Sequence, residues 1–342
     1  MKKFIAIAFM LAVCLTGCHK KEKVATPSLS PEQKEVVKNV NISFDRYEKA
    51  LFSLDINHLA DGVSKLYGKY PDFFIPKDCW KNEAAIQGLK GYITDPVMKE
   101  LYRDVQKKYP DLKALEDEFN KAAKNYLTHF PEADVPKVYT MISGMNSEMG
   151  SVWGQDNNVV ICLDMYLGKD YKNYDYARIP KFISERCESK YMITDCFTKV
   201  ISYKHLPDKT LITVLDNMID KGKQLFFTQT IFPETSEQDI LGYSDEKYQW
   251  ANEHEAQIWQ YFIEKNILYS KDDDAIRRMI DETPFTRDFG NVSPGRIGTF
   301  LGLRIVNSYM KKHPETTLEE LMKLSDYQMI LKESGYKPSL KK

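Results

Sequence analysis

The sequence predicts a mainly α-helical protein with a small β component, an α+β fold. Apolar residues recur at spacings of three and four over most of the chain, and two short runs are instead rich in valine, isoleucine and tyrosine. The 342 residues are enough to bury a large core. Since no internal repeat or clear boundary interrupts the pattern, residues 35–342 are expected to form one domain.

The amino end has the pattern of a secretory signal. Lys2 and Lys3 precede an apolar run over Phe4–Val13, which is shorter than the roughly 20 residues that a membrane-spanning helix needs. Residues Leu15–Cys18 resemble the bacterial lipobox, which implies removal of residues 1–17 and attachment of lipid to Cys18. Several acyl chains on that residue would anchor the protein to a membrane. The alternative is an ordinary signal peptide in which this cysteine is incidental.

Residues 18–34 are expected to form a lipidated, flexible tether, because they are rich in Lys, Ser, Thr and Pro and lack apolar periodicity. Residues His19–Lys23 lack the acidic run that often follows the lipidated cysteine in surface-exported lipoproteins. The protein is therefore expected in the cell envelope, anchored to a membrane and facing the periplasm.

Charge and cysteine content bound the function further. A formal net charge of −1 gives no support for nucleic-acid binding. The spacings of Cys79, Cys162, Cys187 and Cys196 show no disulfide framework. Cys187 and Cys196 are expected on one helix, about 13 Å apart along its axis, which is too far to bridge. Buried free thiols are therefore expected.

In the first half of the body, helical spacing predicts helices over Asn57–Lys69 and Asp95–Lys107, each ending close to a Tyr-Pro pair. A third, amphipathic helix is expected over Asp111–Tyr126. The period then changes, which predicts strands over Lys137–Ile142 and Asn158–Leu163, joined by a polar connection over Gly144–Asn157.

The second half is predicted to be helical. The pattern runs over Ile179–Phe227 with a break near Pro207, and continues over Ser244–Lys265, Asp273–Ile280 and Ile297–Lys312. A short helix over Leu318–Leu324 precedes a polar tail. Asp272–Asp274 could suggest a cation site, but three carboxylates before a helix are more typical of capping.

Standard catalytic motifs are absent from the sequence. There is no dinucleotide fingerprint, phosphate-binding loop or nucleophile elbow. Glu255 follows His254, but a zinc-protease helix needs a second histidine where this chain has Ile258. Asn252 and Glu253 in the same cluster are either the solvated side of a helix or part of a polar site.

Several segments together resemble the gliding-motility lipoprotein GldB family of the Bacteroidetes. They occur in the family's order from about Ile42 to the carboxyl end: Val160–Gly168, Gly222–Phe226 leading to Phe232-Pro233, Gly242–Phe262, Ser293–Met310 and Tyr336–Pro338. Each motif by itself has low specificity for the family, but their occurrence together in this order is specific.

That family is in turn similar to zincin-type metalloproteases, which implies a zincin-like helical domain. In zincins an HExxH helix and a later Glu-Gly pair supply the metal ligands and base. Here the corresponding positions read Thr194–Thr198, which contains no histidine, and Lys221-Gly222. A lysine would repel zinc at close range. The resemblance therefore implies a domain without the HExxH motif, with no metal, no cofactor and no catalytic residues.

The segment from Ser293 to Arg304 supports two interpretations. Ser293 has the properties of an N-cap, Pro294 suits a first helical position, and Gly295 would leave amides accessible to an anion or carboxylate. Alternatively, Gly298 and Gly302 let this helix pack closely on a neighbour, and its two arginines, Arg296 and Arg304, pair with internal carboxylates.

The leading hypothesis is a non-enzymatic scaffold or accessory subunit of an envelope machine, which binds an envelope protein. The candidate partner or ligand site comprises Asp164, Asn252, Glu253, Ser293, Gly295, Arg296 and Arg304. The first alternative is a periplasmic hydrolase of peptide or cell-wall material that uses Glu253, His254 and Glu255 with Asp164. The second is a ligand-binding lipoprotein.

Overall fold

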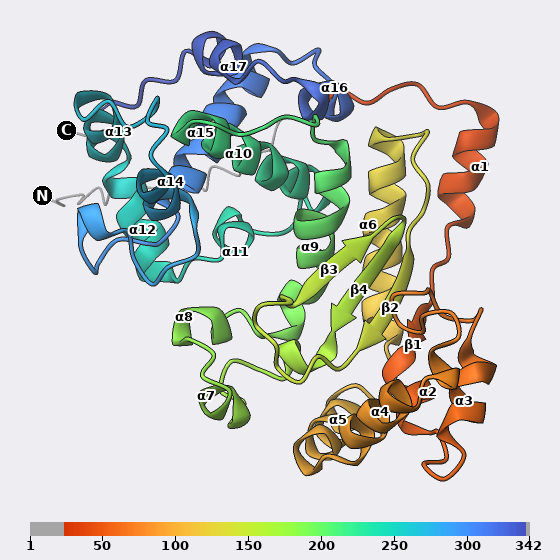
Figure 1. Cartoon of the computed structure of the whole chain (residues 1–342). Coiled ribbons are helices and arrows are strands. Elements are labelled where there is room, and N and C mark those ends of the chain that lie inside the picture. The colour runs from red at the N-terminus through yellow and green to blue at the C-terminus, as the bar shows by residue number, and fades with distance from the viewer. Residues whose placement is uncertain (1–23, 340–342) are drawn as a thin grey trace, which may run out of the picture.

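The computed structural model describes residues 24–339, in which helices surround a four-stranded sheet (Figure 1). The strands are β1 (Phe44–Arg46), β2 (Lys137–Met141), β3 (Val152–Gln155) and β4 (Asn158–Cys162), in the spatial order β1-β2-β4-β3. β1, β2 and β4 are parallel, and β3 is antiparallel to β4. The predicted mainly helical α+β class is confirmed.

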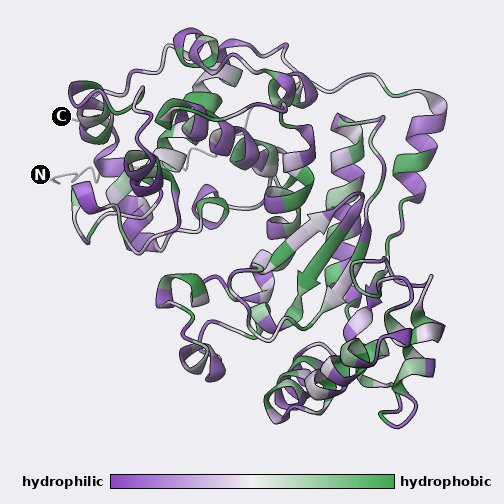
Figure 2. Ribbon diagram, in the orientation of Figure 1, coloured by the Kyte–Doolittle hydropathy of each residue, from purple (hydrophilic) through white to green (hydrophobic). Residues whose placement is uncertain are grey.

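Both predicted strands exist, as β2 and β4. Two strands were not predicted: β1, and β3, which lies within the predicted connection. A two-residue loop at Asp156 and Asn157 joins β3 to β4, and Asp156 has a left-handed backbone (φ 53°). Such a residue is typical of tight hairpins. β4 is the most apolar strand in Figure 2, and its last four residues are fully buried, as expected for a strand covered on both faces.

The two faces of the sheet carry different helices. Val138, Val159 and Ile161 face the main core, which includes Phe119 of α6 (Lys113–His129). Neighbouring strand residues face the other side, where they meet a smaller core built from the following helices. These are α2 (Tyr47–Phe52), α3 (Leu59–Leu66) and α4 (Glu83–Thr94), and α5 (Pro96–Lys108) follows α4. The predicted helices at 95–107 and 111–126 are confirmed as α5 and α6.

The centre of the second half is the pair α10 (Val214–Ile231) and α15 (Ile297–Lys312), which lie side by side (Figure 1). Glycines permit this close approach. A Cβ added at Gly302 would lie 1.9 Å from the carbonyl oxygen of Met218, and one at Gly222 would lie 2.4 Å from the carbonyl of Gly302. The prediction that Gly298 and Gly302 serve helix packing is confirmed.

The remaining α-helices after β4 have the following bounds. They are α7 (Asn173–Tyr176), α8 (Lys181–Ser184), α9 (Met192–Cys196), α11 (Glu237–Leu241), α12 (Asp245–Glu253), α13 (Glu255–Glu264), α14 (Asp273–Ile280), α16 (Leu318–Lys323) and α17 (Tyr327–Ser334). The helix predicted over 244–265 is two helices that meet at His254. α17 lies in the predicted polar tail, where Tyr327 and Ile330 are buried.

The prediction of one helix carrying Cys187 and Cys196 was wrong. α8 ends at Ser184 and α9 begins at Met192, so Cys187 lies in the connection between them and Cys196 is the last residue of α9. All four body cysteines are free, and the expectation of burial is confirmed for Cys162, Cys187 and Cys196, whereas Cys79 is only partly buried.

Part of the predicted tether is ordered. Ala25 forms a bridge with Thr317, and α1 (Pro31–Asn39) begins inside the predicted tether. Ser30 and Gln33 form a reciprocal capping box, a local signal for a helix start that composition alone does not reveal. Cys18 and the predicted signal, residues 1–17, lie outside the described residues. No helix within residues 24–339 is long and apolar enough to cross a membrane.

Candidate functional site

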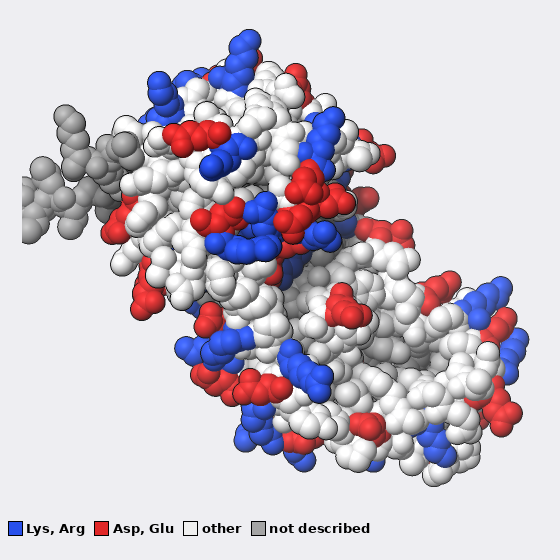
Figure 3. Space-filling model, turned by 60° about the vertical axis from the view of Figure 1, so that its left-hand side comes forward, with Lys and Arg blue, Asp and Glu red and all other residues white. Residues whose placement is uncertain are grey.

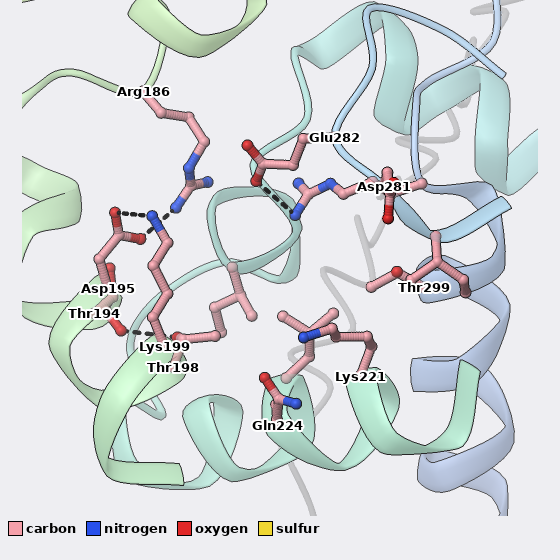
Figure 4. Close-up of a pocket in the computed structure, with 14 residues that line it drawn as sticks. Arg186, Thr194, Asp195, Thr198, Lys199, Lys221, Gln224, Asp281, Glu282 and Thr299 are labelled. Carbon is pink, nitrogen blue, oxygen red and sulfur yellow. Dashed lines mark hydrogen bonds and ion pairs between the residues drawn. The ribbon is translucent and has the colours of Figure 1, made fainter. Parts of the chain in front are cut away.

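A pocket of about 310 Å³ lies where α9, α10, α15 and the segment after α14 meet (Figure 4). Its lining carries four cationic side chains and three carboxylates: Arg186, Lys199, Lys221, Arg296, Asp195, Asp281 and Glu282. A larger cavity of about 730 Å³, bordered by Val24 and Thr26, has fewer charged side chains. Charged groups gathered in a concave site favour the smaller pocket as the functional candidate.

One wall of the pocket is a helix of changing pitch. α9 continues into a π-helix, η4 (Phe197–Ile201), so Thr194 and Thr198 are carried on one irregular helical segment. π-helical turns are rare and often occur at functional sites. The Thr198 hydroxyl donates to the carbonyl of Thr194 at 2.7 Å and lies 2.7 Å from the Thr228 hydroxyl. The irregular segment is therefore tied to α10.

Asp195 is the central buried carboxylate of the site, with 3% of its surface exposed. Its oxygens accept hydrogen bonds from Arg186 at 2.8 Å, Lys199 at 3.0 Å and the Tyr166 hydroxyl at 2.8 Å. Burial by itself would raise the pKa of Asp195, but Lys199 and Arg186 favour the ionised form and hold it at about 2. Both cations are thereby partly neutralised.

Arg296 occupies the opposite side of the pocket. It has a left-handed backbone (φ 55°) immediately before α15, and the Tyr243 hydroxyl supports this turn by bonding the Arg296 carbonyl at 3.2 Å. The guanidinium donates to the Leu241 carbonyl at 2.5 Å and pairs with Glu282 at 3.1 Å. The nearby Arg296 charge lowers the pKa of Glu282. Arg296 therefore pairs with a carboxylate, as expected, but Glu282 is exposed and not internal.

Three polar side chains of α10 and α15 complete the pocket. Within residues 24–339, Lys221 forms no hydrogen bond or ion pair, and the Thr299 hydroxyl is buried without a hydrogen-bond partner. The amide nitrogen of Gln224 donates to Asp220 at 2.8 Å. Figure 4 shows Lys221 and Thr299 reaching the same space from adjacent helices. Among the described residues, the pocket therefore contains a cation and a hydroxyl without partners, and the carboxylate of Asp281 has none either.

The sequence comparison decides the family. Residues 29–338 match the family model described as Gliding motility protein GldB. The chain belongs to the GldB family. It matches no curated protein and no solved structure. The match covers nearly all of the described residues, so the family assignment applies to the whole body of this GldB-family protein.

The residues predicted as a site in this GldB-family protein do not lie together, and only Arg296 of that set lines the pocket. Asp164 is fully buried beside the sheet. Its oxygens accept from the backbone amides of Ser143 at 2.9 Å and Met145 at 2.7 Å, and from the Ser143 hydroxyl at 3.0 Å. Burial raises the pKa of Asp164, and these hydrogen bonds oppose the shift. Its contacts are those of a side chain that fixes a turn.

Asn252 and Arg304 belong to a separate polar cluster. Arg304 contacts both oxygens of Glu237, at 3.0 and 2.9 Å, and pairs with Glu255 at 3.5 Å. It also donates to the Asn252 side-chain oxygen at 2.5 Å. The expected pairing of Arg304 with internal carboxylates is confirmed. Glu253 is exposed on the outer side of α12.

The prediction of Ser293 as an N-cap was wrong, because α15 begins at Ile297. Ser293 is fully buried in the preceding loop, where its hydroxyl bonds the Thr286 amide at 3.1 Å and the Gly290 carbonyl at 2.7 Å. Gly295 packs so closely that an added Cβ would lie 2.0 Å from the Thr283 carbonyl oxygen. These contacts replace the exposed helix start that the local sequence suggested.

Most residues of the pocket were not predicted from the sequence as site residues. They include Arg186, Lys199, Gln224, Glu282 and Thr299, which come from distant segments without a shared motif. Four lining residues, Thr194, Asp195, Thr198 and Lys221, do fall at positions that the sequence analysis compared with zincin metal ligands. Asp272 caps α14, as expected, and residues 24–339 contain no group of three or more His, Cys, Asp or Glu side chains that could hold a metal ion.

Proposed function

We propose that this GldB-family protein is a non-enzymatic scaffold or accessory subunit of an envelope machine. In this proposal, lipid on Cys18 anchors it to a membrane, and its body faces the periplasm and binds an envelope protein. The observation that carries the proposal is the chemistry of the pocket formed by Thr194, Asp195, Thr198 and Lys221.

The pocket has the layout of a zincin site with different side chains. In the spacing of an HExxH motif, Thr194 and Thr198 stand at the two histidine positions and Asp195 at the glutamate position. Lys221 stands at the position of the later glutamate. That these four side chains line one pocket supports descent from a metalloprotease. Zinc sites use thiolate, imidazole and carboxylate ligands, so threonines and a lysine do not form a zinc donor set.

Asp195 is also a poor catalytic base. A general base accepts a proton near neutral pH, and its pKa should lie close to the working pH. Two cations hold the pKa of Asp195 at about 2, and three side chains occupy its oxygens. Its carboxylate is therefore suited to fixing Arg186 and Lys199 in place.

The residues of the alternative hydrolase are dispersed. Asp164 is enclosed by a turn, while Glu255 accepts from the Tyr336 hydroxyl at 2.7 Å and pairs with Arg304. Glu253 is exposed. General acid–base catalysis needs such groups to converge on one substrate position. A stoichiometric bound metal, or hydrolysis that is lost in Glu253→Ala, would support the hydrolase instead.

The surface is compatible with a protein partner. On the face drawn in Figure 3, acidic and basic side chains are interspersed. The formal net charge is −1, and nucleic-acid binding usually depends on a concentrated basic surface. These features support the choice of an envelope protein over a nucleic acid as the proposed partner.

The test is crosslinking of the tagged lipoprotein in intact cells, followed by mass spectrometry, with Cys18→Ala as the control. We expect one or two envelope proteins to be captured reproducibly from the native protein and lost from the control. A native protein that crosslinks to nothing specific, and sediments as a monomer after purification without its lipid, would contradict the scaffold proposal.

A further inference from the structure

The Thr299 hydroxyl is an unsatisfied group at the pocket wall. Thr299 is only 4% exposed, and its oxygen has no hydrogen-bond partner in the described chain. Buried hydroxyls are rarely left unpaired, since the loss of their hydrogen bonds to water is then uncompensated. Thr299 lines the pocket, so a ligand bound there is the nearest available partner that we infer for this hydroxyl.

Lys221 supplies an available positive charge beside that hydroxyl. The other three cations of the pocket each pair with Asp195 or Glu282, whereas Lys221 pairs with no described residue. Four cations and three carboxylates give the lining a formal charge of +1. A monoanion balances this charge, whereas a doubly charged phosphate exceeds it and is repelled about twice as strongly by the three carboxylates. The charge balance therefore favours a single carboxylate.

Gln224 adds a hydrogen-bond acceptor to the pocket wall. Its amide nitrogen is directed at the Asp220 carboxylate, which the Tyr327 hydroxyl also contacts at 3.0 Å. A carboxylate can only accept hydrogen bonds, so the amide nitrogen of Gln224 must face it. The carbonyl oxygen is thereby left to accept from another group, and Gln224 lines the pocket. A ligand with an N–H group can use it.

We propose that this pocket binds the carboxyl end of a peptide. Lys221 and Thr299 would bind the terminal carboxylate, and the Gln224 carbonyl would accept from the last amide N–H. The cavity of about 310 Å³ lies at the lower end of the range for small-ligand sites, which suits one terminal residue. This inference deepens the proposed function, on which it rests in taking the pocket as a binding site and not a catalytic centre.

The test is titration calorimetry with the complete lipidated protein in detergent. The probes are N-acetyl-alanyl-alanine, its carboxyl-terminal amide, its analogue with the last amide N-methylated, glucuronate and inorganic phosphate. We expect the free acid to bind and the other four probes to bind at least about tenfold more weakly. If the acid does not bind, if its amide binds equally, or if glucuronate or phosphate binds as tightly, the proposal is overturned.

Variants of the pocket residues test whether the peptide acid binds in this pocket. We expect Lys221→Gln to weaken binding of the acid at least about tenfold and Thr299→Val to weaken it about threefold or more. Lys65→Gln, at an exposed lysine of α3, is the matched control and should leave affinity unchanged. Circular dichroism checks that each variant is folded, and the probe comparison on the native protein does not depend on any variant. Unchanged affinity in Lys221→Gln would overturn the assignment.

Mass spectrometry of the recovered peptide separates the two proposals. A peptide that binds and is recovered intact supports both. A peptide that is recovered as N-acetyl-alanine and alanine, the products of hydrolysis at its Ala–Ala bond, would contradict the non-enzymatic function, even if the affinities agree with the binding site. A peptide that is intact but unbound overturns the binding site alone.

Discussion

Lys223 on α10 is a lysine with no exposed surface, and it makes folding stability depend on pH. Its amine donates to the carbonyl oxygens of Met322 and Leu324, both at 2.7 Å. Burial lowers the pKa of Lys223 to about 7, with Asp220 opposing the shift and Lys209 adding to it. An unfolded lysine keeps its proton up to about pH 10.

The direction of this pH dependence is set by the number of protons that the folded and unfolded states bind. Between pH 7 and about 10, the unfolded chain holds a proton on Lys223 that the folded protein has released. The free energy of unfolding therefore rises with pH in this window, by up to about 1.4 kcal/mol per pH unit. Integrated from pH 7 to 9.5 with a folded pKa of about 7, the gain is about 3 kcal/mol. A folded pKa one unit higher would give about 2 kcal/mol.

The assay is urea denaturation of the unlipidated protein at several pH values, compared with Lys223→Met. Methionine has a similar length and no charge, so the other titrating groups largely cancel in the difference between the two proteins. We expect the free energy of unfolding of the native protein, relative to that of Lys223→Met, to increase by about 2–3 kcal/mol from pH 7 to 9.5. A difference that stays constant within about 0.5 kcal/mol over this range would refute the reasoning.

Three further predictions follow from the packing, the buried carboxylate and the proposed anchor. Gly302→Ala should lower stability by about 3 kcal/mol or more, because the added methyl group would meet a backbone carbonyl of α10. Gly88→Ala, at an exposed position of α4, is the control and should raise stability by about 0.5–1 kcal/mol. Thermal denaturation would compare the two variants with the native protein. Asp195→Asn should lower the free energy of unfolding by about 3 kcal/mol at pH 7, because it leaves two cations without their counter-charge. In the native protein, the stability that ionised Asp195 contributes should be lost as the pH falls from about 4 through 2. Denaturation at each pH would show this loss. Cys18→Ala should move the protein from the membrane fraction to the soluble fraction, and continued sedimentation with membranes would contradict anchoring at this residue.

Much of the fold could be predicted from local patterns. The helices at Asp273–Ile280 and Ile297–Lys312 have the predicted bounds, because apolar spacing and end signals agree there. β2 and β4 were predicted from their change of period. The break at His254 and the strand β3 were missed, since a short strand in a polar connection gains its hydrogen bonds only from β4.

The sequence by itself determined the fold class, the family and the main helix-packing glycines. These properties depend on residue types and short spacings, which can be recognised without knowing which distant residues are in contact. Only the tertiary structure decided which charged groups share a pocket. Asp195, Lys221 and Thr299 come from three separate helices, and the Ser293 hydroxyl is buried in a loop where its local sequence suggested a helix cap. Burial and partner choice depend on how the helices pack, which no local pattern encodes.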